Sequence, residues 1–165
     1  MKYYPIFMDI KDRECLVVGA GPVGARKALG LLRAGAKVIV VSPGMTPKMD
    51  AARQKGAICL ERPYEPADVR DKALVFAATS DSDLNRRILA DAQDRGIFCN
   101  VADAPSASDF ILPSVVERGD LILAVSTSGN SPALARTIKQ QLEAAFGPEY
   151  ETILRVFGRI RQGLL

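Results

Sequence analysis

Residues 14–24, E-C-L-V-V-G-A-G-P-V-G, join an apolar run to three glycines with the spacing G-x-G-x-x-G. A short apolar run bounded by glycine is typical of a buried strand, and residues 22–34 continue with a helical pattern. In this context Gly19 permits a tight turn, Gly21 permits close approach to a pyrophosphate, and Gly24 lets the helix pack on the strand. The start of the helix adds unpaired N–H groups that favour phosphate. The stretch therefore predicts a dinucleotide-binding loop rather than a glycine-rich turn without a ligand.

Strands and helices alternate along the chain that follows. We predict further strands at residues 37–41, 57–60, 73–77 and 97–100, with helices at residues 47–55 and 81–95. Strict alternation with short glycine-bearing links indicates a parallel sheet covered on both faces. The predicted fold class is α/β, with a Rossmann-like nucleotide-binding domain over residues 1–104.

The pattern changes after Pro105. Residues 110–117 and 121–126 are β-rich and predict an antiparallel hairpin, in which Pro113 indicates an edge or a bulge. Ser131-Pro132 then begins a helix, with serine as the cap. An isolated hairpin is marginally stable, so we expect a symmetry-related copy of the chain to cover it. The remaining predicted segments are a hairpin-and-helix dimerisation unit over residues 105–146 and the start of a C-terminal helical region over residues 147–165.

Composition excludes several classes of function. The chain has 165 residues, 48% of them hydrophobic, a formal net charge of +3 and no histidine, which removes Ser-His and Cys-His nucleophilic pairs and every histidine-containing metal site. Cys15, Cys59 and Cys99 lack Cys-x-x-Cys spacing, so we expect buried reduced thiols and no metal site. The chain has no block of Lys and Arg residues of the kind that binds nucleic acid. It also has no apolar run that is long enough to cross a bilayer or to serve as a signal peptide. We therefore expect neither a nucleic-acid nor a membrane partner, and a cytoplasmic location.

The end of the second predicted strand leaves the choice of cofactor open. An acidic residue usually binds the adenosine ribose there, whereas this chain has Ser42, Pro43 and Gly44. No acidic residue occurs between Glu14 and Asp50. From spacing alone NADP is as admissible as NAD. The alternative is that the backbone at Pro43 and Gly44 contacts the ribose without any readout by a side chain.

Two further segments follow strands and so reach the same sheet edge. Thr79, in the small-residue stretch at residues 77–81, is a candidate cofactor contact near the nicotinamide, although these residues suit a helix cap equally well. Asn100 and Asp103 follow at the carboxyl end of the fifth strand, where open α/β sheets bind ligands. Since histidine is absent, the Asp103 carboxylate is the best available proton acceptor. The alternative for Asp103 is a turn-forming role before Pro105.

A hydroxyl- and glycine-rich loop precedes the helix that starts at Ser131. Ser126, Thr127 and Ser128 lie in it. Backbone N–H groups in such a loop can bind carboxylates or phosphates. We assign these three residues and Asn100 to substrate binding; the alternative for the loop is a plain link between hairpin and helix.

Several motifs of the chain occur together in one family. They are P-I-F at residues 5–7, C-L-V-V-G-A-G at 15–21, R-K-A at 26–28, A-A-T at 77–79, F-C-N-V-A-D-A-P at 98–105, F-I-L-P-S at 110–114 and S-P-A-L-A-R at 131–136. With these motifs the chain resembles the precorrin-2 dehydrogenase family, which is also found as the N-terminal part of sirohaem synthases.

The resemblance implies an activity and a set of site residues. It implies NAD-dependent oxidation of precorrin-2, an anionic tetrapyrrole, to sirohydrochlorin on the route to sirohaem or cobalamin. It places the NAD contacts at Pro22-Val23 and Pro43-Gly44 and the catalytic aspartate at Asp103. It also implies a homodimer, and some relatives insert Fe²⁺ into the product. The competing hypothesis is an NAD-sensing Rossmann module without turnover.

Overall fold

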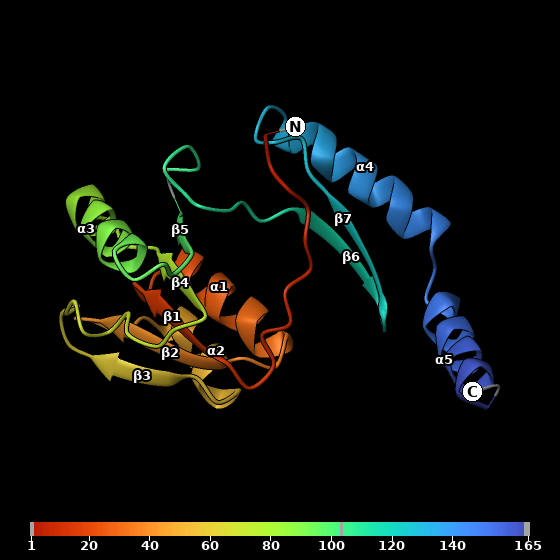
Figure 1. The fold of residues 1–165 in the computed structure, drawn as a ribbon, viewed down its shortest axis with the longest axis horizontal. Helices are drawn as coiled ribbons and strands as arrows, with labels where there is room; N and C mark the ends of the chain where they lie inside the picture. Colours follow the sequence, from red (N-terminus) through yellow and green to blue (C-terminus); the bar gives the residue numbers. More distant parts are fainter. Residues whose placement is uncertain (1, 103, 164–165) are drawn as a thin grey trace. The chain divides into compact units, whose positions relative to one another are not determined.

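The computed structural model describes residues 2–102 and 104–163 and divides into two compact units (Figure 1). The first unit is Tyr4–Ile111, and the second runs from Leu112 onward and includes Lys2 and Tyr3. The elements of the first unit are β1 (Glu14–Val18), α1 (Pro22–Arg33), β2 (Lys37–Ser42), a 3₁₀ turn (Pro47–Met49), α2 (Asp50–Gln54), β3 (Ile58–Glu61), β4 (Leu74–Ala77), α3 (Ser82–Gln93) and β5 (Cys99–Val101).

The first unit is a five-stranded parallel sheet in the order β3-β2-β1-β4-β5. The chain moves outward from β1 to β3 and then crosses back to β4, so the strand order reverses between β1 and β4. The carboxyl ends of all five strands lie at one edge of the sheet because the strands are parallel. The predicted α/β fold with a Rossmann-like sheet is confirmed.

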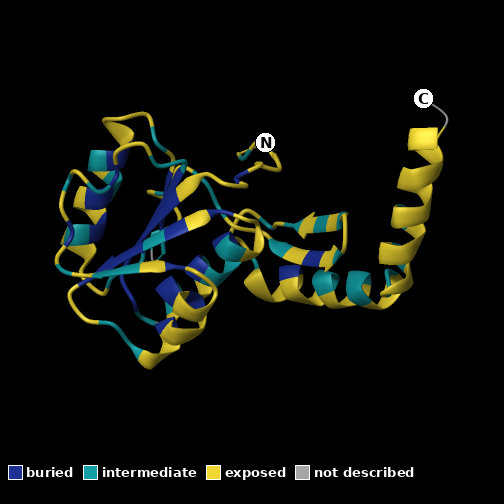
Figure 2. Ribbon diagram, turned by 90° about the horizontal axis from the view of Figure 1, so that it is seen from below, coloured by how far each residue is buried: buried dark blue, intermediate teal, exposed yellow. Residues whose placement is uncertain are grey.

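Alternate residues of the strands build two separate cores. Cys15 and Val17 of β1 pack with Ala28 of α1 and Ala52 of α2 on one face of the sheet. The intervening β1 residues, Leu16 and Val18, lie on the other face, where α3 packs through Ile88 and Ala92. Both faces of β1 are consequently buried, as the continuous apolar run requires (Figure 2).

The second unit contains a two-stranded antiparallel hairpin and two helices. Its elements are β6 (Ser114–Arg118), β7 (Leu121–Val125), α4 (Pro132–Ala145) and α5 (Glu149–Gly163). The Ser131 hydroxyl caps α4 by accepting the N–H of Leu134, as predicted. The Arg118 guanidinium donates to the carbonyls of Phe146 and Glu143, so it pairs groups that the end of α4 leaves free.

The first strand of the hairpin starts later than predicted. The sequence pattern puts its start at residue 110, whereas β6 begins at Ser114, directly after Pro113. Proline has no N–H for a strand ladder, and Phe110 is engaged elsewhere. Its ring packs edge-on against Phe76 of β4, with centroids 5.5 Å apart, and its carbonyl accepts the side-chain N–H of Asn100.

Residues 105–111 therefore belong to the first unit by their contacts. Asp109 accepts the Cys99 N–H at 2.8 Å, and the Ser108 hydroxyl accepts the Val101 N–H at 2.9 Å. No helix in residues 2–102 or 104–163 has the length and apolar character needed to span a membrane.

Candidate functional site

The reversal of strand order between β1 and β4 locates the candidate site. In open α/β sheets ligands bind outside the carboxyl ends of the strands, at the point where the order reverses. In the first unit the loop after β1 and the loop after β4 flank this point. The loop after β1 carries the glycine motif, so sequence and topology agree on the same edge.

The three glycines of the motif, two in the loop after β1 and one in α1, differ in what an added side chain would meet. Gly19 has φ +108°, and a Cβ there would clash with the carbonyl oxygen of Ala78 and lie 3.0 Å from the nitrogen of Thr79. At Gly24 a Cβ would overlap the carbonyl oxygen of Gly19. At Gly21 nothing lies within 4 Å, so the space above it is open. Gly19 and Gly24 are thus required by the fold, whereas Gly21 leaves room for a ligand.

The start of α1 fits a bound phosphate. Gly21 is its N-cap, no side chain caps it, and no acidic residue occurs in its first turn, which starts with Pro22 and Val23. The first N–H groups of a helix have no partner within the helix, and they favour an anion. The predicted cofactor contact at Gly21, Pro22 and Val23 thus has open space at Gly21 and the N–H donor of Val23, whereas Pro22 has no N–H to donate.

The loop after β2 is fixed by two side-chain hydrogen bonds. The Ser42 hydroxyl donates to the carbonyl of Gly44 at 2.9 Å, and the Thr46 hydroxyl donates to the carbonyl of Ala20 at 2.6 Å. The second bond ties this loop to the glycine loop, a role for Thr46 that nothing in the sequence pattern signals. Pro43 and Gly44 are exposed at the same place. The Ser42 hydroxyl is thus hydrogen-bonded within the loop. The groups that remain for contact with a ribose are those of the exposed backbone at Pro43 and Gly44.

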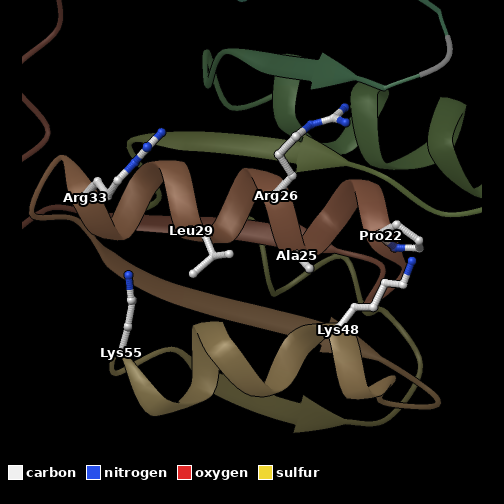
Figure 3. A pocket seen from close by; sticks show the side chains of 7 residues that line it. All are labelled: Pro22, Ala25, Arg26, Leu29, Arg33, Lys48 and Lys55. Carbon is white, nitrogen blue, oxygen red and sulfur yellow. The ribbon is translucent and has the colours of Figure 1, made fainter. Parts of the chain in front are cut away.

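A basic hollow of about 420 Å³ lies along the outer side of α1, toward α2 (Figure 3). Its lining residues are Pro22, Ala25, Arg26, Leu29, Arg33, Lys48 and Lys55. None of its four cationic side chains forms a salt bridge with any residue that the structure describes. Lys48 lies at the Pro22 end of α1 (Figure 3). The positive charge at this end favours an anion at the start of the helix.

Thr79, predicted to contact the cofactor, is held by Asn85 of α3. The Thr79 N–H donates to Asn85 Oδ1 at 3.2 Å, and Asn85 Nδ2 donates to the Thr79 carbonyl at 3.1 Å. The Thr79 hydroxyl lies 2.7 Å from Asn85 Oδ1 and accepts the N–H of Asp81 at 3.2 Å. Asp81 in turn caps α3. Residues 77–81 therefore do contain a helix cap, at Asp81, and the Thr79 hydroxyl is hydrogen-bonded to Asn85 and Asp81.

Two site residues, Asn100 and Asp103, are predicted at the end of β5, and the structure describes only the first of them. Asn100 is buried, and its amide nitrogen donates to the carbonyl of Phe110 at 2.8 Å. This hydrogen bond gives the side chain a structural role. Asp103, predicted to be catalytic, lies outside the described residues. In the sequence it stands two positions after Val101, the last residue of β5.

The predicted substrate loop belongs to the second unit and precedes α4. Ser128 has φ +54° and Gly129 φ +88°. The Thr127 hydroxyl donates to the Ser131 carbonyl and accepts the Ser131 N–H, while the Ser126 hydroxyl accepts the Ser128 N–H. The loop is thus closed by its own hydroxyl groups, which orders the backbone before the helix.

Cysteine and lysine side chains near the sheet have shifted pKa values. Burial, with a further contribution from the charge of Asp109, raises the pKa of Cys99 to about 12. Burial also lowers the pKa of Lys27, whose ammonium lies 5.5 Å from the ring centroid of Phe76. The Cys99 thiol is therefore neutral near pH 7 and is a poor nucleophile.

Comparison with known proteins agrees with this geometry. The family described as putative NAD(P)-binding matches residues 6–114, and the one described as sirohaem biosynthesis protein, central, matches residues 118–145. A siroheme synthase of Thioalkalivibrio sulfidiphilus is 45% identical over 151 residues, and that of Salmonella schwarzengrund is 40% identical over 162. The matched parts are 91% and 98% of this chain but 31% and 35% of those proteins, so the chain spans about a third of their length.

One solved structure resembles nearly all of the chain. It is SirC, precorrin-2 dehydrogenase, with a TM-score of 0.77 and 27% identity, over 93% of this chain and 76% of that one. The likeness covers the parallel sheet and extends into the hairpin and helices that follow it. Together with the glycine loop at the point where the strand order reverses, these matches show that the chain belongs to the putative NAD(P)-binding family, among the relatives of sirohaem synthases and precorrin-2 dehydrogenase.

Proposed function

We propose that this chain oxidises precorrin-2 to sirohydrochlorin with NAD⁺, on the route to sirohaem. The observation that carries the proposal is the open space over Gly21, at the start of an uncapped helix and at the point of strand reversal. The relatives supply the substrate class, because siroheme synthases and a precorrin-2 dehydrogenase match most of the chain.

In this reaction the substrate loses two hydrogens, one as a hydride and one as a proton. NAD⁺, when bound, takes up the hydride and leaves as NADH. The protein has to hold the cofactor, orient the substrate and accept the proton. For the pyrophosphate we propose the backbone N–H groups of Gly21 and Val23, with Pro22, which has no N–H, packing beside it, and for the ribose the backbone at Pro43 and Gly44.

Asp103 is our proposed proton acceptor. In the sequence it stands two positions after Val101, the last residue of β5, and β5 pairs with β4, the strand that the Thr79 loop follows. With no histidine in the chain, a carboxylate is the available base. We propose that the loop at Ser126, Thr127 and Ser128 binds carboxylates of the substrate, because ordered backbone before a helix favours anions.

We also propose that the functional form is a homodimer. The second unit exposes Ile122 of the hairpin and Ile153, Phe157 and Ile160 of α5, which has no buried residue (Figure 2). A hairpin with so little cover is marginal alone. A second copy of the chain would bury these side chains on both partners at once.

The test is the appearance of NADH absorbance when the protein is mixed with NAD⁺ and precorrin-2. We expect NADH to form, and the Asp103→Ala variant to bind NAD⁺ normally and form none. Bound NAD⁺ with no NADH from the unaltered protein would indicate a sensor instead. An active Asp103→Ala variant would remove the proposed base, and tighter binding of NADP⁺ than NAD⁺ would overturn the cofactor assignment.

Insertion of Fe²⁺ into sirohydrochlorin is a separable activity of the same proposed site. A carboxylate could remove the pyrrole N–H protons that metal insertion displaces. The test is anaerobic incubation of protein, sirohydrochlorin and Fe²⁺, followed by the absorbance spectrum of the product. Sirohaem formed faster than in the protein-free control, and lost in Asp103→Ala, would establish it; a rate equal to the control would exclude it.

A further inference from the structure

Asn85 connects helix α3 to the loop that faces the glycine motif. Its side chain is 1% exposed, and it donates to the carbonyl of Thr79 while accepting the N–H of the same residue. Only a side chain with both a donor and an acceptor can make this pair, which an amide provides. The backbone of Thr79 is thereby fixed relative to α3.

The fixed loop touches the glycine motif through its backbone. The Ala78 carbonyl and the Thr79 nitrogen occupy the space where a side chain of Gly19 would lie, and the Ala78 N–H donates to the Val18 carbonyl at 2.8 Å. The two loops on either side of the strand reversal are thus in direct contact. A shift of the Thr79 backbone would therefore change the sheet edge at which we propose that the cofactor binds.

We propose that Asn85 is a positioning residue for the nicotinamide half of the cofactor. It acts through the backbone of the loop between β4 and α3 and does not touch the cofactor itself. The adenosine half of a dinucleotide is bound by the glycine loop and the end of β2, and the nicotinamide half lies across the strand reversal, on the β4 side. Loss of Asn85 therefore affects NAD⁺ more than a ligand confined to the adenosine side. This inference rests on the proposed use of NAD⁺.

The test compares two ligands, NAD⁺ and ADP, in titrations with three variants. Asn85→Leu removes both hydrogen bonds to the Thr79 backbone, and Asn85→Asp keeps only the acceptor. The matched control is Tyr64→Phe, which removes a 2.8 Å hydrogen bond from the Tyr64 hydroxyl to Asp91 of the same helix. Thermal unfolding of each variant shows the accompanying loss of stability.

We expect Asn85→Leu to weaken NAD⁺ binding roughly tenfold, a change in binding free energy similar in size to the contribution of one or two hydrogen bonds. We expect the same variant to weaken ADP binding less than about threefold. Asn85→Asp is expected to lie between Asn85→Leu and the unaltered protein, and it provides the measurement if Asn85→Leu does not fold. Tyr64→Phe should lower the melting temperature yet leave both affinities within about twofold. Equal weakening of NAD⁺ and ADP, or unchanged NAD⁺ affinity in a folded Asn85 variant, would overturn the proposal. Failure of the unaltered protein to bind NAD⁺ would instead overturn the proposed function on which it rests.

Discussion

Gly21 and Gly24 differ in what an added methyl group would meet, so a substitution at Gly21 can test ligand binding without disturbing the fold. A Cβ at Gly24 overlaps backbone, whereas one at Gly21 meets nothing within 4 Å. Gly21 also has φ −73°, which alanine adopts without strain. We predict that Gly21→Ala leaves the free energy of unfolding within about 0.5 kcal/mol but weakens NAD⁺ binding at least tenfold, because its methyl group occupies the space proposed for the pyrophosphate.

Gly30→Ala is the matched control for this variant. Gly30 lies within α1, also with nothing within 4 Å of an added Cβ. Alanine there should stabilise the helix by about 0.5–1 kcal/mol and leave NAD⁺ binding unchanged. Urea unfolding and NAD⁺ titration of both variants measure the two effects; equal NAD⁺ affinity in Gly21→Ala and the unaltered protein would contradict the assignment of the phosphate site.

The buried thiol of Cys99 predicts a loss of stability at high pH. Burial raises its pKa to about 12 in the folded chain, against about 8.5 for an exposed thiol. Because the folded state favours the neutral thiol, its stabilising effect is complete below pH ~8.5 and is lost as the pH rises toward 12. Urea unfolding across this range should show a decline that is smaller in Cys99→Ala. Identical slopes in Cys99→Ala and the unaltered protein would contradict this account.

Helix α3 depends on one of the two aspartates at its start. Asp81 accepts the N–H groups of Asp83 and Leu84, whereas Asp83 forms an exposed ion pair with Arg86. We predict that Asp81→Ala lowers the free energy of unfolding by about 1 kcal/mol and Asp83→Ala by less than about 0.5 kcal/mol. Urea unfolding measures both. An equal loss in the two variants would contradict the capping role.

The sequence predicted the type and order of the elements in the first unit because each one carries a local signal. The apolar run that marks a strand, the apolar spacing that marks a helix and the glycine that ends it each occupy a short segment of the chain, so each element can be recognised without knowledge of its distant contacts. β6 starts four residues later than the apolar pattern indicates, because Phe110 packs against Phe76, a contact between distant parts of the chain. Thr46 escapes prediction for the same reason, since its hydrogen bond reaches back to Ala20. The role of Asn85 escapes prediction although Thr79 is only six residues away, because an asparagine in an amphipathic helix gives no periodic signal.

At the scale of the whole molecule, the exposed apolar side chains of the second unit predict self-association. Sedimentation should give the mass of two chains for the unaltered protein. The double variant Ile122→Lys with Phe157→Lys should sediment as a monomer, because it places charge in the proposed interface. The control is Ile58→Lys on β3 of the first unit, where Ile58 is 58% exposed and Phe157 is 61% exposed. A monomeric unaltered protein would exclude the proposed dimer.

The central claim is that the edge where the strand order reverses binds NAD⁺ and carries out the oxidation. The most direct measurement is NADH formation during precorrin-2 oxidation, without oxygen, in the unaltered protein and in Gly21→Ala, at one NAD⁺ concentration below the dissociation constants of both. We predict one NADH and one sirohydrochlorin for each precorrin-2 oxidised by the unaltered protein, and a rate of NADH formation at least tenfold lower in Gly21→Ala. Sirohydrochlorin formed without NADH, or the same rate of NADH formation from both proteins, would contradict the account.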